Sequence, residues 1–224
     1  MGQAIGELLP TAVGVALSPL SIVATVLMLL SPRGRVNGPA FLLGWIVGVV
    51  GVGAIVLLVA SGAGAHDEGQ PADWVSWLEL LLGLSLLRIA FRQFRSRPHG
   101  DEEPVTPKWM GALDSFTPPK AAAAGVALSA LNPKNLVLVV AGMAAVAQTG
   151  ISTGDQIVAL VVFAIVASIG VVTPIVIYFG LGDRAPELLE RLRRWMTHNN
   201  AVIVAAILAV IAAKIIGDAI SGLS

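Results

Sequence analysis

Six long apolar runs dominate this 224-residue sequence. A helix needs about 20 mainly apolar residues to cross a hydrocarbon core of about 30 Å, and each of these runs is long enough. No stretch alternates with a period of two residues, as the strands of a membrane barrel do, and open sheet edges cannot face lipid. We therefore predict an all-α integral membrane protein with six transmembrane helices. The predicted spans cover residues 4–30, 39–61, 74–94, 121–147, 155–180 and 200–221.

The composition excludes several classes of protein. Charged residues make up only 12% of the chain, against about 25% in ordinary soluble domains. The absence of cysteine rules out a disulfide scaffold, a cysteine zinc site and thiol redox chemistry. The net charge of zero provides no overall field that would attract nucleic acid. Because His66, His99 and His198 stand apart from carboxylates at ligand spacing, we expect no metal site. The sequence contains no Ser-His-Asp arrangement, no phosphate-binding glycine loop and no paired carboxylates within a span, so we expect no enzymatic activity. We also expect no cofactor and no nucleic-acid partner.

Basic residues gather in alternate connections, and this pattern predicts the orientation of the chain. Twelve of the fourteen Lys and Arg residues follow the first, third or fifth span, and basic connections stay on the cytoplasmic side. We predict a multi-pass protein of the cytoplasmic (inner) membrane with both termini outside. Residues 1–9 contain no Lys or Arg, so we expect the first run to be a retained span and not a signal peptide. The twelve basic residues are Arg33, Arg35, Arg88, Arg92, Arg95, Arg97, Lys108, Lys120, Arg184, Arg191, Arg193 and Arg194.

Two of the predicted cytoplasmic connections have patterns of their own. Residues 96–120 contain five prolines and an acidic run at 101–103, which is typical of a linker. Within residues 183–197, five apolar side chains share one helical face, away from the arginines. We predict an amphipathic helix lying on the cytoplasmic leaflet; a solvated connector with a basic end is the alternative. The apolar face consists of Leu188, Leu189, Leu192, Trp195 and Met196.

A short motif occurs twice, with an offset of 114 residues. Residues 16–19 read Ala-Leu-Ser-Pro and residues 130–133 read Ala-Leu-Asn-Pro, each near the middle of a 27-residue apolar run. Three spans in each half make the halves run in opposite directions, and paired proline-interrupted spans are the pattern of inverted-repeat transporters. We predict two inverted three-helix repeats, residues 1–95 and 121–224, with broken first and fourth helices, joined by a cytoplasmic linker over 96–120. Chance similarity between the two motifs is the alternative.

The segment Asn132-Pro133-Lys134-Asn135 brings polar groups to the centre of the predicted fourth span. The ring of Pro133 clashes with the preceding turn and frees the carbonyl of Ser129, and a lysine at this depth costs at least about 2.5–3.5 kcal/mol. We infer that Lys134, with Asn132, Pro133 and Asn135, faces a cavity between the halves and binds an anionic substrate group or a coupling ion. A structural lysine, paired with carbonyls of the broken helix or reaching toward an interface, is the alternative.

Other polar residues are weaker candidates for the same site. Ser18, Pro19 and Ser21 occupy the matching place in the first half, where we expect them to break the helix and offer neutral hydrogen bonds to the cavity. Thr173 and Pro174 predict a further kink late in the fifth span. For that pair, a binding role and an ordinary membrane-helix proline explain the pattern equally well.

Two further charges fall within predicted spans. Glu79 and Lys214 lie within a turn or two of the outer interface, so they can form an ion pair between helices. Lys214 can instead pair with Asp218, one turn further along its own helix. A structural role is favoured for both, because charged side chains near the end of a span can reach the interface.

These motifs resemble those of the lysine-exporter (LysE) superfamily of six-span bacterial exporters. Within that superfamily, the chain is most similar to the glycopeptidolipid-addressing (GAP) and sulfolipid-addressing proteins of mycobacteria and related actinobacteria. The Asn-Pro-Lys motif at 132–134 matches the superfamily well, whereas Ser18-Pro19 matches its first-span proline motif in part. The resemblance implies a role in moving a cell-envelope lipid, or in helping a larger lipid exporter to do so. It is carried by residues 17–19, 28–33, 41–45 and 130–136.

Three functions remain open from the sequence. The first is an exporter of an amphiphilic envelope lipid or lipid precursor, which the resemblance implies. The second is an exporter of a small solute such as an amino acid or ion. The third is a non-transporting accessory subunit of a larger lipid-export complex. The expected partners are the bilayer, a lipid or small-molecule substrate, that export complex and a second copy of the chain.

Overall fold

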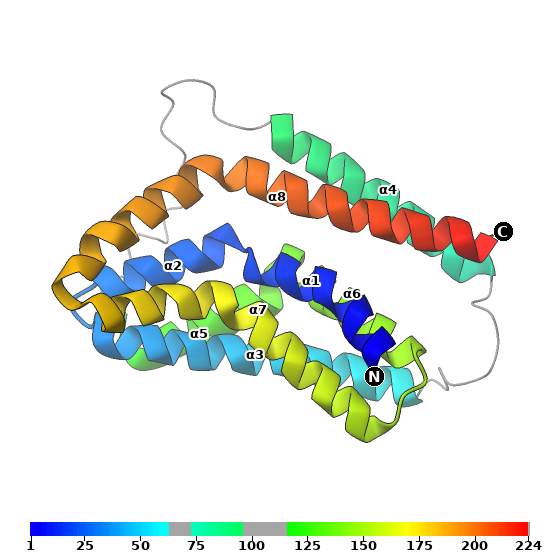
Figure 1. Ribbon diagram of the computed structural model, residues 1–224, viewed down its shortest axis with the longest axis horizontal. Coiled ribbons are helices and arrows are strands. Elements are labelled where there is room, and N and C mark those ends of the chain that lie inside the picture. Colours follow the sequence, from blue (N-terminus) through cyan, green and yellow to red (C-terminus); the bar gives the residue numbers. More distant parts are fainter. Residues whose placement is uncertain (63–72, 96–115, 224) are drawn as a thin grey trace. The chain divides into compact units, whose positions relative to one another are not determined.

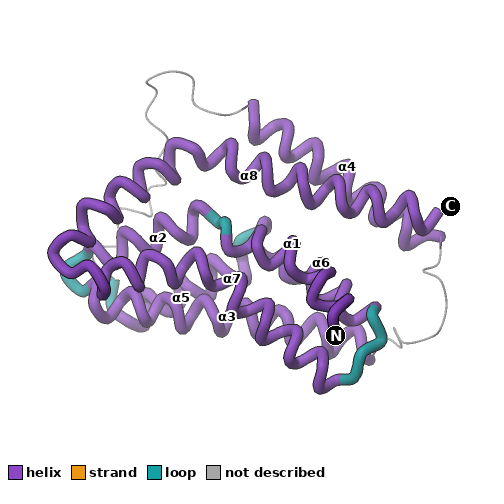
Figure 2. The backbone as a smooth tube through the Cα atoms, viewed as in Figure 1, coloured by secondary structure: helices purple, strands orange, loops and turns teal. Residues whose placement is uncertain are grey.

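The computed structural model describes residues 1–62, 73–95 and 116–223, and in this part of the chain helices joined by short loops are the only regular secondary structure (Figure 1; Figure 2). The all-α prediction is therefore confirmed. In chain order the helices are α1 (Gly2–Ala16), α2 (Pro19–Leu30), α3 (Gly34–Gly62), α4 (Asp73–Arg95), α5 (Pro118–Val126), the π-helix η2 (Ala127–Leu131), α6 (Pro133–Gln148), α7 (Thr153–Leu181), the short 3-10 helix η3 (Gly182–Arg184) and α8 (Ala185–Leu223).

Length and composition make this a membrane protein. Two of the described helical stretches, Gly34–Ala60 and Thr153–Ser221, are long and apolar enough to cross a bilayer. The number rises to four when α1 with α2, and α5 and η2 with α6, each count as one bent span. The prediction of six spans goes beyond this range and stays a prediction.

The chain bends sharply at both copies of the repeated motif. The bend is 49° between α1 and α2 and 62° between η2 and α6. Before each proline the backbone is extended, with φ −85° and ψ 101° at Ser18 and φ −68° and ψ 117° at Asn132. A proline forces its predecessor out of the helical region and is itself well suited to the first turn of a new helix. Pro19 and Pro133 therefore end one helix and begin the next.

The helices form two compact units. Unit one holds α1, α2, α3, α5, η2, α6, α7 and η3, with the first part of α8 up to Thr197. Unit two holds α4 and the rest of α8 from His198 onward. Each predicted half of the sequence therefore contributes helices to both units. Most of the predicted linker, residues 96–115, lies outside the described residues, and α5 begins at Pro118.

Small residues allow the helices of unit one to approach closely. In this unit α5 packs on α3, and α1 packs on both α6 and α7 (Figure 1). A Cβ atom on Gly44 of α3 would overlap the backbone of Ala122 of α5, and one on Gly125 of α5 would overlap the backbone of Phe41 of α3. Such contacts between backbones require glycine. Beside them, the fully buried rings of Phe41 and Trp45 stack with centroids 6.5 Å apart.

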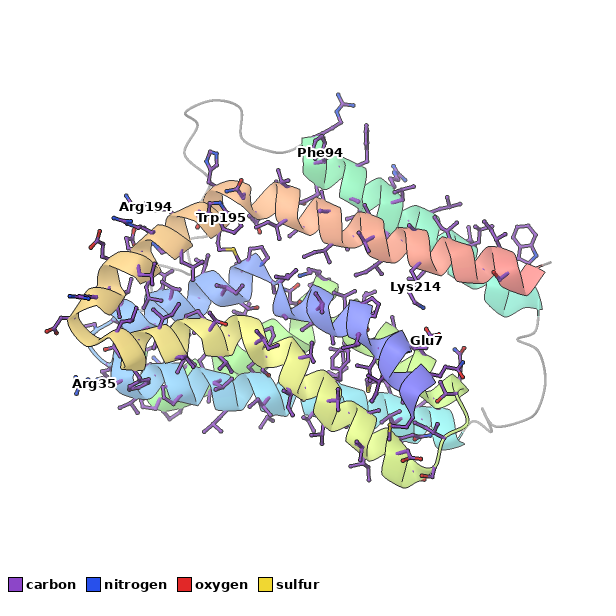
Figure 3. The ribbon with its side chains drawn as sticks, viewed as in Figure 1. Glu7, Arg35, Phe94, Arg194, Trp195 and Lys214 are labelled. Atoms are coloured by element: carbon purple, nitrogen blue, oxygen red, sulfur yellow. The ribbon has the colours of Figure 1, made fainter. Side chains whose placement is uncertain are left out.

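The predicted amphipathic segment is helical and continues without a break into the predicted sixth span, since α8 runs from Ala185 to Leu223. Its expected apolar face divides into two parts. Leu189 and Met196 are buried, whereas Leu188 and Trp195 are exposed. Figure 3 shows Trp195 and Arg194 projecting from this part of α8. The exposed pair leaves an apolar strip beside arginines, as expected of a helix at a membrane surface.

Candidate functional site

Lys134 connects the two helix breaks. It lies in the first turn of α6, and its Nζ donates hydrogen bonds to the carbonyl oxygens of Gly14 at 2.9 Å and Leu17 at 3.4 Å. Both carbonyls belong to the C-terminal end of α1, where carbonyl groups lose their helical partners and carry partial negative charge. The ammonium of a residue in the second half thus caps a broken helix of the first half.

Asn135 caps the other broken helix. Its Nδ2 donates to the carbonyl oxygen of Leu128 in η2 at 2.8 Å and to Oγ of Ser18 at 3.4 Å. Ser18 also accepts a hydrogen bond from Oγ of Ser21 at 3.2 Å. All three of these polar side chains are buried. Two adjacent residues of α6 therefore bind the two helix ends, and the residues predicted at positions 18, 21, 134 and 135 form one cluster.

The backbone around Pro133 explains how Lys134 and Asn135 reach these ends. Oδ1 of Asn132 accepts a hydrogen bond from the backbone N–H of Lys134 at 3.1 Å, which makes Asn132 the N-cap of α6. Asn is among the best N-cap residues, and the first turn of α6 is thereby held in place. Ser18 occupies the same position before Pro19 but makes no cap bond with its side chain. Its Oγ is instead engaged by Ser21 and Asn135.

The π-helix η2 precedes the second break. Ser129 of η2 is fully buried, and its Oγ donates to the carbonyl oxygen of Val126 at 3.1 Å. A Cβ atom on Gly48 of α3 would overlap this Oγ, and one on Gly170 of α7 would overlap the carbonyl oxygen of Ala16. Each break therefore packs against a glycine of a long helix from the other half of the sequence. Short π-helical segments are frequent at functional sites.

Sequence reasoning missed three buried polar atoms, two of them on α3. Among the described residues, Nε1 of Trp45, Oδ1 of Asn37 and Oδ1 of Asn135 are buried without a hydrogen-bond partner. Nδ2 of Asn37 does donate to the carbonyl oxygen of Phe116 at 2.9 Å. The sequence did contain a sign that Trp45 is buried, because it lies between Gly44 and Gly48. Glycines on both sides of a tryptophan indicate that another helix packs closely around the indole ring.

Thr173 and Pro174 lie outside the cluster of Ser18, Ser21, Lys134 and Asn135. The side chain of Thr173 is exposed, and its Oγ1 donates to the carbonyl oxygen of Ile169 at 2.7 Å. Pro174 is buried within α7, which continues through it. This geometry is that of an exposed hydroxyl satisfied by a carbonyl of its own helix.

The pair predicted between Glu79 and Lys214 involves the side chain of Glu79, which lies outside the described residues. Lys214 is half-buried on α8 in unit two (Figure 3). The side chain of Asp218, its alternative partner, also lies outside the described part of the chain. No group of His, Cys, Asp or Glu suited to a metal ion occurs among the described residues.

The cluster is suited to holding an anionic group. An ammonium has three N–H donors, and the described residues provide two acceptors for Lys134. The N-termini of α2 and α6 both begin at this level and carry partial positive charge. The present contacts of Lys134 are those of the structural alternative, in which the lysine binds broken-helix carbonyls. The same ammonium can exchange a carbonyl for a negatively charged oxygen, to which hydrogen bonds are stronger.

Comparison with known proteins identifies the family. Searches of curated proteins and of solved structures found no match. A family model described as Sap, sulfolipid-1-addressing protein (SfLAP), matches residues 8–221. This range covers the repeated motif, both helix breaks and α8 almost to its end, in agreement with the resemblance inferred from the motifs. The chain belongs to the SfLAP family.

Proposed function

We propose that this protein is a carrier that moves an envelope lipid or lipid precursor outward from the cytoplasmic leaflet of the inner membrane. The family is named for the addressing of a sulfolipid, an anionic amphiphile, and the chain is a membrane protein by length and composition. The observation that carries the proposal is the bond between Lys134 in one half of the sequence and Gly14 in the other. It brings a cation to the meeting point of two broken helices, which is where transporters of this class bind their substrates.

The proposed architecture is a pair of inverted three-helix repeats with six spans and both termini outside. The matching backbone conformations of Ser18 and Asn132 support the repeat. So does the exchange of contacts between the halves, in which α1 packs on α7 and α5 packs on α3. Alternating access would then consist of a rocking of one half against the other around the two breaks.

In this mechanism the caps on the broken helices are exchangeable. An anionic headgroup would take the place of the Gly14 and Leu17 carbonyls on the ammonium of Lys134. The end of α1 would lose its cap and become free to move. Because an anionic oxygen competes with the two carbonyls for the same ammonium, substrate binding and closure of the break oppose each other. The substrate thereby shifts the balance between two arrangements of the helices.

Reconstitution tests the proposal directly. Purified protein in liposomes is supplied with a fluorescent anionic lipid in one leaflet, and its appearance in the other leaflet is followed with a membrane-impermeant quencher. Lys134→Met should abolish movement, and Lys134→Arg should retain part of it because the charge remains. Lys120→Met, the same change at an exposed lysine of α5, is the matched control. Normal movement by Lys134→Met would refute the role of the ammonium.

An accessory subunit is the second candidate. The observation in its favour is that, within the described part of the chain, the hydrogen bonds of Lys134 go to backbone carbonyls alone. In that case the wild-type protein would move no lipid in liposomes. A deletion strain would still lack one surface lipid, and co-purification would recover a larger exporter. Movement of a labelled amino acid in place of a lipid would instead support export of a small solute.

A further inference from the structure

Unit two contains an apolar cavity that the proposed function does not use. It lies between α4 and the part of α8 that belongs to this unit, with a volume of about 750 Å³. Ligand pockets in proteins typically measure about 300–1,000 Å³. Its apolar wall includes Leu84, Phe91 and Phe94 of α4 and Ala206 and Ala209 of α8. Figure 3 shows Phe94 near the end of α4.

Small residues on one helix and large ones on the other give this cavity its form. Further toward the C-terminus of α8, the two helices are in close contact, since a Cβ atom on Gly83 would overlap the side chain of Ile216. At the level of the cavity the alanines of α8 do not fill the space beside the rings of α4. The wall residues Leu84, Phe91 and Phe94 are 42–59% exposed, so the space is an open groove, and its apolar wall favours contact with hydrocarbon.

One charged residue lines the cavity. Arg88 of α4 contributes to the wall, and within the described part of the chain no carboxylate forms an ion pair with it. Arg92 and Arg95 follow in the last turn of the same helix, and the guanidinium of Arg95 lies over the ring of Phe91 at 5.8 Å. An apolar helix packed into this space would enclose the guanidinium of Arg88 without a partner, at considerable cost. The charge therefore selects a ligand that has an anionic end.

The length of the cavity agrees with one leaflet of a bilayer. Leu84 and Phe94 are ten residues apart, which corresponds to about 15 Å of helix. The hydrocarbon core measures about 30 Å across two leaflets. The basic end of α4 follows the third predicted span, on the side predicted to be cytoplasmic. A ligand here would lie with its chain along the cytoplasmic leaflet and its head toward the arginines.

We propose that this cavity binds an acyl chain of an anionic lipid, whose headgroup is held by Arg88. The ligand class follows from the wall, which accepts hydrocarbon, and from the single cation, which requires an anionic group such as a phosphate or sulfate. The site belongs to unit two, whereas Lys134 belongs to unit one, so the proposal does not depend on the carrier mechanism. It adds a lipid site that remains even if the protein moves nothing.

Native mass spectrometry of the purified full-length protein tests this site without any transport step. The probes are phosphatidylglycerol and diacylglycerol, which lacks the phosphate, with identical acyl chains. The wild type should retain one phosphatidylglycerol with a roughly tenfold preference, the size expected of a charge-assisted hydrogen bond. Arg88→Gln should reduce the preference to about twofold or less, as one such bond is lost. Arg35→Gln, at an exposed arginine of unit one, is the control and should behave as the wild type.

A second pair of variants tests the location. Ala206→Trp fills the cavity and should lose both lipids, whereas Ala213→Trp, at an exposed position of α8, should keep them. Ala209→Phe serves the same purpose if Ala206→Trp does not elute as a single species. Equal lipid retention by the filled variants and the wild type would overturn the proposal, as would an undiminished preference in Arg88→Gln. Loss of a dimer on filling the cavity would overturn it too, since a second copy would then be the occupant.

Discussion

The ammonium of Lys134 lies 2.9 Å from the carbonyl oxygen of Gly14, although 120 residues separate them in the chain. Gly14 is buried near the end of α1, and its carbonyl is one of the groups that a broken helix leaves without a helical partner. Lys134 therefore stabilises the break in addition to any contact with substrate. The two roles can be separated, because they respond differently to substitution.

Lys134→Met should destabilise the protein by about 1–3 kcal/mol, the cost of leaving a buried acceptor unsatisfied. Lys134→Arg should cost less, since a guanidinium also donates hydrogen bonds to carbonyls. Thermal unfolding in detergent measures both values, with Lys120→Met as the control that leaves stability unchanged. A Lys134→Met protein as stable as the wild type would mean that the bond to Gly14 does not hold α1 in place.

Asn135→Ala should lower the free energy of unfolding by about 1–3 kcal/mol. The substitution removes the donor for the Leu128 carbonyl and leaves Ser18 with one hydrogen bond fewer. Gln148→Ala changes an exposed amide at the other end of α6 and should stay within about 0.5 kcal/mol of the wild type. Chemical denaturation in mild detergent compares the two. Equal effects would show that the burial of Asn135 contributes nothing specific.

Gly170→Ala should be destabilising by about 1–3 kcal/mol, because an added Cβ overlaps the Ala16 backbone and must push α7 away from the first break. Gly180→Ala, on the same helix with no atom near its Cβ, should be neutral or stabilising by up to about 0.8–1.0 kcal/mol. Melting temperatures of the two variants provide the comparison. If Gly170→Ala behaves as Gly180→Ala does, α1 and α7 are not in close contact.

Gly48→Ala makes the same test at the second break. Its Cβ would overlap Oγ of Ser129 in η2, whereas a Cβ on Gly51 meets nothing within 4 Å. We expect Gly48→Ala to lose stability by about 1–3 kcal/mol. The double variant Gly48→Ala/Ser129→Gly should recover much of the loss, since it removes the overlapping atom. Absence of recovery would contradict the contact between these two residues.

The chain contains no cysteine, so single introduced cysteines report the predicted orientation without background. Gln148→Cys should react with a membrane-impermeant maleimide on intact cells, because the connection after the fourth span is predicted to face outward. Arg33→Cys and Arg191→Cys should react only after permeabilisation, since both follow odd-numbered spans. Labelling of Arg33→Cys from outside would contradict the orientation, and labelling of all three from one side would contradict the inverted halves.

Much of the fold could be predicted because it depends on local chemistry. Apolar runs require helices in a membrane, and Pro19 and Pro133 cannot continue the helix before them. Both breaks therefore occur where expected. The family assignment also follows from short motifs around these prolines. The number of spans is less accessible, since α4 and α8 carry more polar residues than the other helices.

The partners of the site residues depended on packing that no local pattern reveals. Lys134 could bind several carbonyls, and its choice of Gly14 and Leu17 follows from the contact between α1 and α6. Thr173 has the same chemistry as Ser18, yet the rotation of α7 turns it outward. The environment of Trp45 results from the close approach of α3 and α5. Glycines make this approach possible, but they do not determine which two helices come together.

The π-helix at 127–131 makes the two halves of the sequence mechanically unequal. A π turn holds one residue more than an α turn, so this segment can absorb or release that residue by changing its hydrogen-bond register. The end of α1 has no π-helical turn that could change register in this way, because it passes from an α-helical turn to an extended residue within two positions. A change of register before Asn132 would rotate the first residues of α6, which include Lys134 and Asn135.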